Sequence, residues 1–297
     1  MLEVLSQKIT RRTIQIALGV LWCVDGALQL QHRMFTAAFA NQVIAPAAEG
    51  QPRFISGVMH FFIHILLLQP FVCNAIIALI QLGIGVLLIW KRTVKFGITG
   101  SIVWGLFVWY AGEGLGGLAG GQTMLLMGAP GAALLYAIIA CGVVPKSGGG
   151  KDTAQPAVWL AYVWAILWLG GALLQLVAGQ NTTADVAAMI SGMSSGAPGW
   201  LAALDRHTAN ALYEQGNWVI ALLVAGQAVI GFFVLVPRRT RAAAIGAGII
   251  LSLVFWAIGQ SFGAYYSGLA TDPNTAPLVI LLGLAILGAP QMKLEII

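Results

Sequence analysis

The feature that most constrains this chain is a series of apolar segments about as long as a bilayer is thick. Of its 297 residues, 59% are hydrophobic and only 8% are charged, whereas a soluble domain usually carries about 25% charged residues. A helix needs about 20 apolar residues to cross the hydrocarbon core. The apolar segments that approach this length are 13–30, 71–90, 96–111, 132–144, 158–177, 218–236, 242–258 and 278–287. The sequence therefore predicts an all-α integral membrane protein with eight transmembrane helices, of which the two shortest are expected to extend beyond their apolar runs.

The apolar stretch 54–90 is too long for one ordinary span, and Gln69-Pro70 interrupts it. Proline removes a helical hydrogen bond and clashes with the preceding turn, so we expect one helix before Gln69 and a separate span after Pro70. If the first piece does not cross, twelve of the fifteen Lys and Arg residues fall on one face, the pattern typical of cytoplasmic loops. The twelve are Lys8, Arg11, Arg12, Lys91, Arg92, Lys95, Lys146, Lys151, Arg238, Arg239, Arg241 and Lys293.

The chain also resembles itself. An offset of 146 residues pairs Trp22 with Trp168, and an offset of 147 pairs Trp109 with Trp256 and Gly112 with Gly259. The same offset of 147 pairs Ala129-Pro130 with Ala276-Pro277. We expect two parallel four-span repeats, residues 1–145 and 157–297, each with an outer-face helical segment, because an even number of spans preserves orientation. Residues 146–156 form the expected cytoplasmic linker.

Two polar side chains lie in the first apolar segment. Asp25 sits about two-thirds of the way along it, and Gln29 follows one turn later on the same helical face. An acid deep in a span costs about 2.5–3.5 kcal/mol on insertion scales and by default faces the bundle interior. Asp25 and Gln29 are therefore candidates for ligand binding or proton handling; the alternative is that Asp25 fixes helix packing.

Two histidines, His60 and His64 in MHFFIH, are four residues apart and project from one helical face. Such a pair can share a metal ion if another element supplies further ligands, and Glu113 is the candidate third ligand. The simpler interpretation is a pair of interfacial histidines that bond headgroups, water or backbone.

Glu113 lies in GEGLGGLAGG, residues 112–121, where a long apolar run ends. The matched stretch 259–268, GQSFGAYYSG, carries Gln260 in its place. The glycines permit irregular backbone, which membranes tolerate only where protein or a watery cavity surrounds it. Glu113 and Gln260 are therefore candidate ligand-binding residues; the alternative for Glu113 is a helix-end acid held by its neighbours.

The stretches LWCVDGALQL (21–30), GEGLGGLAGG (112–121) and GQSFGAYYSGLATDPNTAPL (259–278) resemble the DoxX/DoxD group of four-helix membrane proteins. The resemblance covers most of the chain as two tandem copies. It implies association with membrane redox chemistry, because DoxD is a subunit of a thiosulfate:quinone oxidoreductase. No catalytic residue is carried over, and the fused duplication departs from the usual single unit.

The sequence thus favours a multi-pass protein of a bacterial or archaeal cytoplasmic (inner) membrane, with both termini cytoplasmic. Its expected role is that of an accessory of respiratory or metal redox chemistry with an outer-facing site for a metal ion or a quinone. Expected partners are the lipid bilayer and other membrane or periplasmic redox proteins, and not nucleic acid. Two alternatives stay open: a small-solute transporter, and a structural subunit of a larger membrane complex. Whether the chain is an enzyme is left open.

Overall fold

The computed structural model describes residues 9–121, 123–145, 155–236 and 238–290, and this part of the chain is all-helical. The expected linker 146–156 lies almost wholly outside the described residues, as do Lys8, Lys146, Lys151 and Lys293. The first half contains α2 (Arg11–Leu28), η1 (His32–Phe35), α3 (Ala37–Phe39), η2 (Ala40–Ile44), α4 (Ala45–Ala48), α5 (Arg53–Leu68), α6 (Pro70–Ile89), α7 (Val94–Ala111), η3 (Gly114–Gly120), η4 (Leu125–Met127) and α8 (Ala132–Gly142). The second half contains α9 (Leu160–Leu174), α10 (Thr183–Met193), α11 (Gly199–Tyr213), α12 (Trp218–Phe233), α13 (Arg238–Ile258), η5 (Ser261–Gly263), η6 (Tyr265–Ser267) and α14 (Thr275–Gly288).

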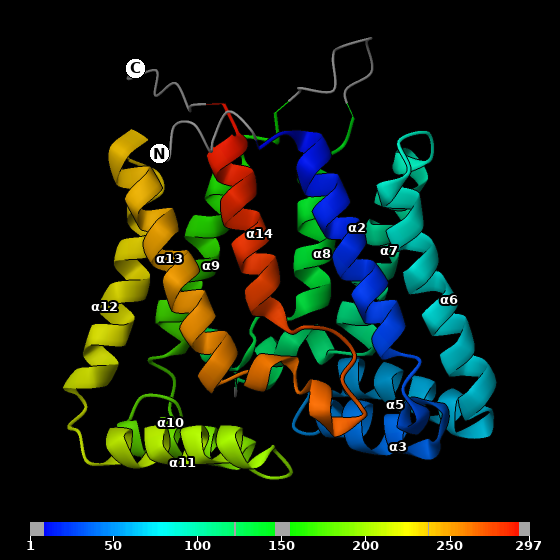
Figure 1. Cartoon of the computed structure of the whole chain (residues 1–297). Helices are drawn as coiled ribbons and strands as arrows, with labels where there is room; N and C mark the ends of the chain where they lie inside the picture. The colour runs from blue at the N-terminus through cyan, green and yellow to red at the C-terminus, as the bar shows by residue number, and fades with distance from the viewer. Residues whose placement is uncertain (1–8, 122, 146–154, 237, 291–297) are drawn as a thin grey trace.

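The helices form one upright layer with a second set lying across one end (Figure 1). Helices α2, α6, α7, α8, α9, α12, α13 and α14 stand roughly side by side, and α3, α5, α10 and α11 lie across the lower end of the view. Helix α14 packs against α2 and α8 of the first half as well as against α9 and α13 of its own half. One hydrophobic core therefore runs through both halves, from Trp22 to Trp164 and Leu282.

The expected break at Gln69-Pro70 is confirmed. Helix α5 ends at Leu68, and Pro70 is the first residue of α6. Between them, Gln69 has a non-helical backbone conformation, with φ −144° and ψ 67°. Proline is well placed there because the first helical residue has no intrahelical partner for its N–H. In the second half, α11 and α12 also meet at a bend, here of 108°, and no proline lies between them.

Among the described residues, three helices are long and apolar enough to cross a membrane: α6, α7 and residues 240–258 of α13. The bent pair of α11 and α12 raises this number to four if it forms one broken span. Helix α2 is long enough but carries Arg11, Arg12 and Asp25. Large apolar side chains such as Phe71, Leu79 and Phe96 point outward from these helices, as expected of surfaces in contact with lipid.

Helices α8 and α14 are short, at 11 and 14 residues. At about 1.5 Å per residue they span roughly 16 and 21 Å, less than the hydrocarbon core. The expected extension is therefore wrong for α8, which ends at Gly142, whereas α14 begins at Thr275, three residues before its predicted start. The described residues between α7 and α8, and those between α13 and α14, contain short 3-10 turns and irregular backbone but no α-helix.

That irregular backbone is left-handed at matched places in the two halves. Residues 114–117 have φ of 55°, 57°, 63° and 75°, and residues 261–264 have 44°, 54°, 78° and 51°. A left-handed turn costs about 1–2 kcal/mol for each residue that carries a Cβ. The first run is glycine except for Leu115, which explains GEGLGG, but the second contains only Gly263.

Close helix packing in the first half depends on small residues. A Cβ at Gly26 of α2 would lie 2.8 Å from the backbone nitrogen of Leu82 in α6, and a Cβ at Gly85 of α6 would lie 2.7 Å from the carbonyl oxygen of Gly19. Membrane helices use such glycines to bring two backbones together. The pairing of α2 with α6 holds Asp25 and Gln29 in their places.

We predict that Gly26→Ala destabilises the protein by about 1–3 kcal/mol through overpacking. Gly83→Ala is the matched control, because a Cβ at Gly83 has no atom within 4 Å, and it should be neutral or stabilise by up to about 1 kcal/mol through helix propensity. Thermal unfolding in detergent measures both variants. Equal unfolding temperatures for the two would contradict this account of the α2–α6 contact.

Candidate functional site

A cavity of about 330 Å³ lies among α2, α6, α7 and α8 in the first half. Most of its wall is apolar or aromatic, and the segment from Phe39 to Ile44 and part of α5 complete it. Its polar lining residues are Asp25, Gln29, Gln81, Glu113, Tyr136, Thr271 and Asp272. Three of the side chains predicted as ligand-binding residues from the sequence, those of Asp25, Gln29 and Glu113, therefore face one space.

Glu113 is held at the start of α8. Helix α7 ends at Ala111, and the backbone then turns into the left-handed run, so that Glu113 Oε1 accepts a hydrogen bond of 3.1 Å from the backbone N–H of Ala133. The first N–H groups of a helix have no intrahelical partner and favour a negative charge. Burial and, to a smaller extent, the charge of Asp272 raise the pKa of Glu113 from 4.5 to about 8, although the bonds to the start of α8 partly oppose the shift.

The other oxygen of Glu113 is left open. Glu113 Oε2 is buried and has no hydrogen-bond partner among the described residues. This oxygen packs against the backbone of Gly131, where there is no side chain. A Cβ at Gly131 would come within 2.2 Å of it. Gly131 also has φ of 103°, a conformation that favours glycine. The sequence thus provides room for this carboxyl next to the cavity.

Asp25 and Gln29 come from the last turn of α2 and are 2% and 1% exposed. Asp25 Oδ1 and Gln29 Oε1 have no hydrogen-bond partner among the described residues. The backbone carbonyl of Gln29, in contrast, accepts a hydrogen bond of 2.8 Å from the Asn74 side chain in α6. Trp22, one turn before Asp25, stacks on Tyr136 of α8 with ring centroids 4.2 Å apart. This contact fixes the distance between the two helices that flank the acid.

The third acid, Asp272, comes from the second half. Its Oδ1 accepts 2.7 Å from the backbone N–H of Asn274, and its Oδ2 accepts 2.6 Å from the hydroxyl of Thr271. Burial raises its pKa, and these two bonds oppose the shift. Sequence reasoning missed Asp272, Thr271 and Tyr136. The available signal was TDPN before an apolar run, a typical turn with an Asx contact, but nothing in it says that the turn reaches the other half.

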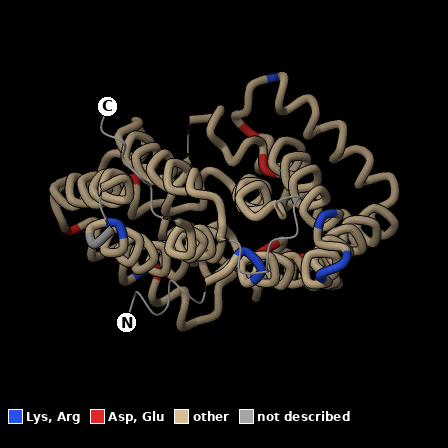
Figure 2. Tube along the Cα trace, turned by 90° about the horizontal axis from the view of Figure 1, so that it is seen from above, with Lys and Arg blue, Asp and Glu red and all other residues tan. Residues whose placement is uncertain are grey.

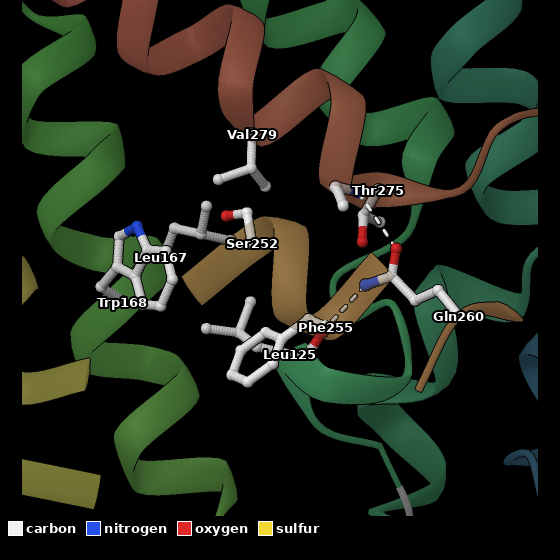
Figure 3. A pocket seen from close by; sticks show the side chains of 9 residues that line it. Leu125, Leu167, Trp168, Ser252, Phe255, Gln260, Thr275 and Val279 are labelled. Atoms are coloured by element: carbon white, nitrogen blue, oxygen red, sulfur yellow. Dashed lines mark hydrogen bonds between the residues drawn. The ribbon is translucent and has the colours of Figure 1, made fainter. Parts of the chain in front are cut away.

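Gln260 lies outside the cavity, in the equivalent place of the second half (Figure 3). Its Oε1 accepts 3.1 Å from the backbone N–H of Ala276 at the start of α14, and its Nε2 donates 3.3 Å to the carbonyl of Leu125. The space beside it measures about 10 Å³, roughly one water molecule. Gln260 therefore has the capping contact of Glu113 but no binding cavity.

Leu125 fills the space that the first half leaves open. It comes from the first half and lies in the wall next to Gln260, Leu167 and Trp168 (Figure 3). A Cβ at Gly171, the residue matched to Asp25, would come within 2.0 Å of the Leu125 side chain. Each half therefore sends a loop into the other: Leu125 closes the second half, and Asp272 enters the cavity of the first.

The matched contacts also revise one detail of the alignment. Trp109 donates 2.7 Å to the carbonyl of Pro130, and its partner Trp256 donates 2.7 Å to the carbonyl of Pro273. Pro130 therefore corresponds in space to Pro273, and the expected pairing of Ala129-Pro130 with Ala276-Pro277 is wrong. The offset between these two prolines is 143 residues and not 147, so the segment before α14 is four residues shorter than the corresponding segment before α8.

The predicted metal set is not brought together. Helix α5 buries Ile55, Met59 and Ile63, which leaves His60 and His64 exposed on another face. Within the described ranges, no three His, Cys, Asp or Glu side chains are close enough to hold one metal ion. The exposed histidines thus fit the interfacial interpretation, whereas Glu113 lines the cavity.

Comparison with family models, with curated proteins and with solved structures finds no match for this chain. The resemblance to DoxX and DoxD proteins stays a prediction.

We predict that stability falls as the pH rises from 4.5 to about 8. The pKa of Glu113 is raised from 4.5 to about 8 in the folded chain. Between these pH values the folded state keeps a proton that the unfolded state releases, so the free energy of unfolding falls as the pH rises. Glu113→Gln should flatten the dependence, because glutamine cannot hold this proton. Unfolding temperatures in detergent between pH 4 and pH 9 measure this.

The control is Glu214→Gln, at an exposed acid after α11, which should keep the slope of the unmodified protein. An unchanged slope in Glu113→Gln would show that this carboxyl does not hold the proton.

Proposed function

We propose that this chain is an integral membrane protein that binds a small, lipid-soluble molecule with hydrogen-bond donors in the first-half cavity. The observation that carries the proposal is the cavity of about 330 Å³ with unpartnered buried oxygens on Asp25, Gln29 and Glu113. Small-molecule sites are typically apolar spaces of about 300–1,000 Å³ with a few placed polar groups. The equivalent place in the second half is filled, so binding belongs to one half.

The proposal includes eight spans arranged as two parallel repeats, with the cavity toward the outer face. Its support is that Arg11, Arg12, the Lys91–Lys95 turn and Arg241 lie where α2, α7 and α13 begin, at the end opposite α5 and α11. Figure 2, which looks along these helices, shows that charged residues occur at few places on the trace. The matched capping and tryptophan contacts support the repeat.

One version of this function is the redox role expected from the sequence, with a reduced quinone as the ligand. A quinol headgroup presents two hydroxyl donors, which fit the orphaned acceptors of Asp25 and Glu113. An oxidised quinone presents acceptors alone and would leave these oxygens unpaired. When bound, a quinol supplies electrons and protons to a redox partner; the residues of this chain would orient its ring and accept its hydrogen bonds.

A second version is transport of a small solute, in which the carboxyls select the solute by charge. Its support is that the three acids of the cavity come from three separate elements, α2, the end of α7 and the loop before α14. Relative movement of these elements would change the site during alternating access. Uptake of a labelled solute into liposomes distinguishes transport from a redox role.

We predict that duroquinol binds saturably to the purified protein and that duroquinone binds about tenfold more weakly. Tenfold corresponds to a loss of roughly 1.4 kcal/mol in binding free energy, because the oxidised form leaves the acceptor oxygens unpaired. Ala111→Phe should abolish binding of both, because Ala111 is buried in the cavity wall and the ring would occupy the space. Isothermal titration calorimetry in detergent measures the affinities, with empty micelles as the blank.

Unfolding temperature serves as the folding control for Ala111→Phe. Undiminished binding in a folded Ala111→Phe variant would place the site elsewhere and overturn the proposed function.

A further inference from the structure

Unpartnered acceptors outnumber unpartnered donors in the cavity: among the described residues, four buried oxygens lack a partner, against two groups that can donate, the Tyr136 hydroxyl and the Trp104 indole N–H. Asp25 Oδ1, Gln29 Oε1, Gln81 Oε1 and Glu113 Oε2 are all buried oxygens without a partner among the described residues, and all four side chains line the same space. An unsatisfied buried acceptor costs about 1–3 kcal/mol. A ligand that brings donors would remove these costs, whereas one that brings acceptors would add to them.

Within the part of the chain that the structure describes, no positively charged side chain lines the cavity. Its lining includes Asp25, Glu113 and Asp272 but no Lys, Arg or His. Arg33, in the turn after α2, donates 2.8 Å to the carbonyl of Ser267 and 2.7 Å to Gln42 Oε1, and it does not line the cavity. Three carboxyls in an apolar space repel one another when charged, because the local dielectric constant is low. A cationic ligand would offset this repulsion.

The remaining wall suits an aromatic or branched apolar body. Trp104 and Phe107 lie with ring centroids 5.1 Å apart, and Phe62 meets Phe107 edge-on at 5.0 Å. Trp22 and Tyr136 face the same space from α2 and α8. Aromatic faces attract ammonium groups through their quadrupole and pack well against another ring. The volume of about 330 Å³ is enough for a molecule of one or two rings.

We propose that the first-half cavity selects a protonated organic amine with a compact apolar body, which its orphaned oxygens bind as hydrogen-bond acceptors. This inference rests on the proposed function, since it names the ligand class of the same cavity. The ammonium group lies between Asp25 and Glu113, and the apolar body lies against the aromatic wall. A neutral quinol satisfies the same acceptors without offsetting their charge and therefore binds more weakly.

The second half provides the comparison that isolates charge. Gln260 makes the same 3.1 Å bond at the start of α14 that Glu113 makes at the start of α8. A glutamine can therefore replace Glu113 as the cap of α8 while its charge is lost. Glu113→Gln tests the ligand class without removing the contact that positions the side chain.

The experiment compares three ligands of nearly equal size: 2-phenylethylamine, 2-phenylethanol and 3-phenylpropanoate. Binding to the purified full-length protein in detergent is followed by tryptophan fluorescence at pH 8.5, above the Glu113 pKa of about 8, so that this carboxyl is charged; empty micelles are the blank. We expect the amine to bind about tenfold or more tightly than the alcohol, a difference of one decade in Kd, and the carboxylate not to bind. Duroquinol should be displaced by the amine.

In Glu113→Gln and in Asp25→Asn, the affinity for the amine should fall about tenfold while that for the alcohol stays within about twofold. Glu214→Gln, outside the cavity, should leave all affinities unchanged. Unfolding temperatures show whether each variant is folded, and Glu113→Gln keeps the test decisive if Asp25→Asn does not fold.

Two results would overturn the inference in distinguishable ways. Equal binding of amine and alcohol, unaffected by Glu113→Gln, would contradict selection by charge but leave the cavity as a binding site. Failure of the amine, the alcohol and duroquinol alike to bind would refute the inference and the proposed function together.

Discussion

The starts of the two short central helices decide how the chain is built. Helices α8 and α14 begin inside the bundle, where their first N–H groups cannot reach bulk water, and an unpaired backbone donor there is costly. The chain meets this demand with one side chain from the preceding helix exit, Glu113 for α8 and Gln260 for α14. To place that side chain, the backbone must reverse within a few residues, and it does so through the two left-handed runs. The cavity wall, the glycines and the position of the acid all follow from this contact.

Much of the fold can be predicted from the sequence because it depends on local patterns. Apolar length and Gln69-Pro70 indicate where helices stand and where one bends, and the glycines of 112–121 indicate irregular backbone. The left-handed run at 261–264 shows the limit of this reasoning, since Ser261, Phe262 and Ala264 adopt positive φ against their own preference. There the surrounding packing outweighs the local cost, and no local pattern reports it.

The site divides in the same way. Asp25, Gln29 and Glu113 could be found because an acid or amide in an apolar segment is costly and therefore informative. Gln260 resembles Glu113 in sequence and in its hydrogen bond, but Leu125 and Gly171 close the space around it. Asp272 could not be found, because its place in the cavity depends on a loop crossing between halves. His60 and His64 share a helical face, yet the burial of Ile55, Met59 and Ile63 turns that face away from the core.

The two crossing loops have a consequence for how such a chain can change over time. Leu125 completes the interior of the second half, and Asp272 completes the interior of the first. A gene for either half alone would encode an open end where the missing loop belongs. A substitution inside either half is therefore tolerated only if the loop that the other half contributes still fits. The cavity of the first half can stay open because a second half, whose corresponding space is filled, packs beside it.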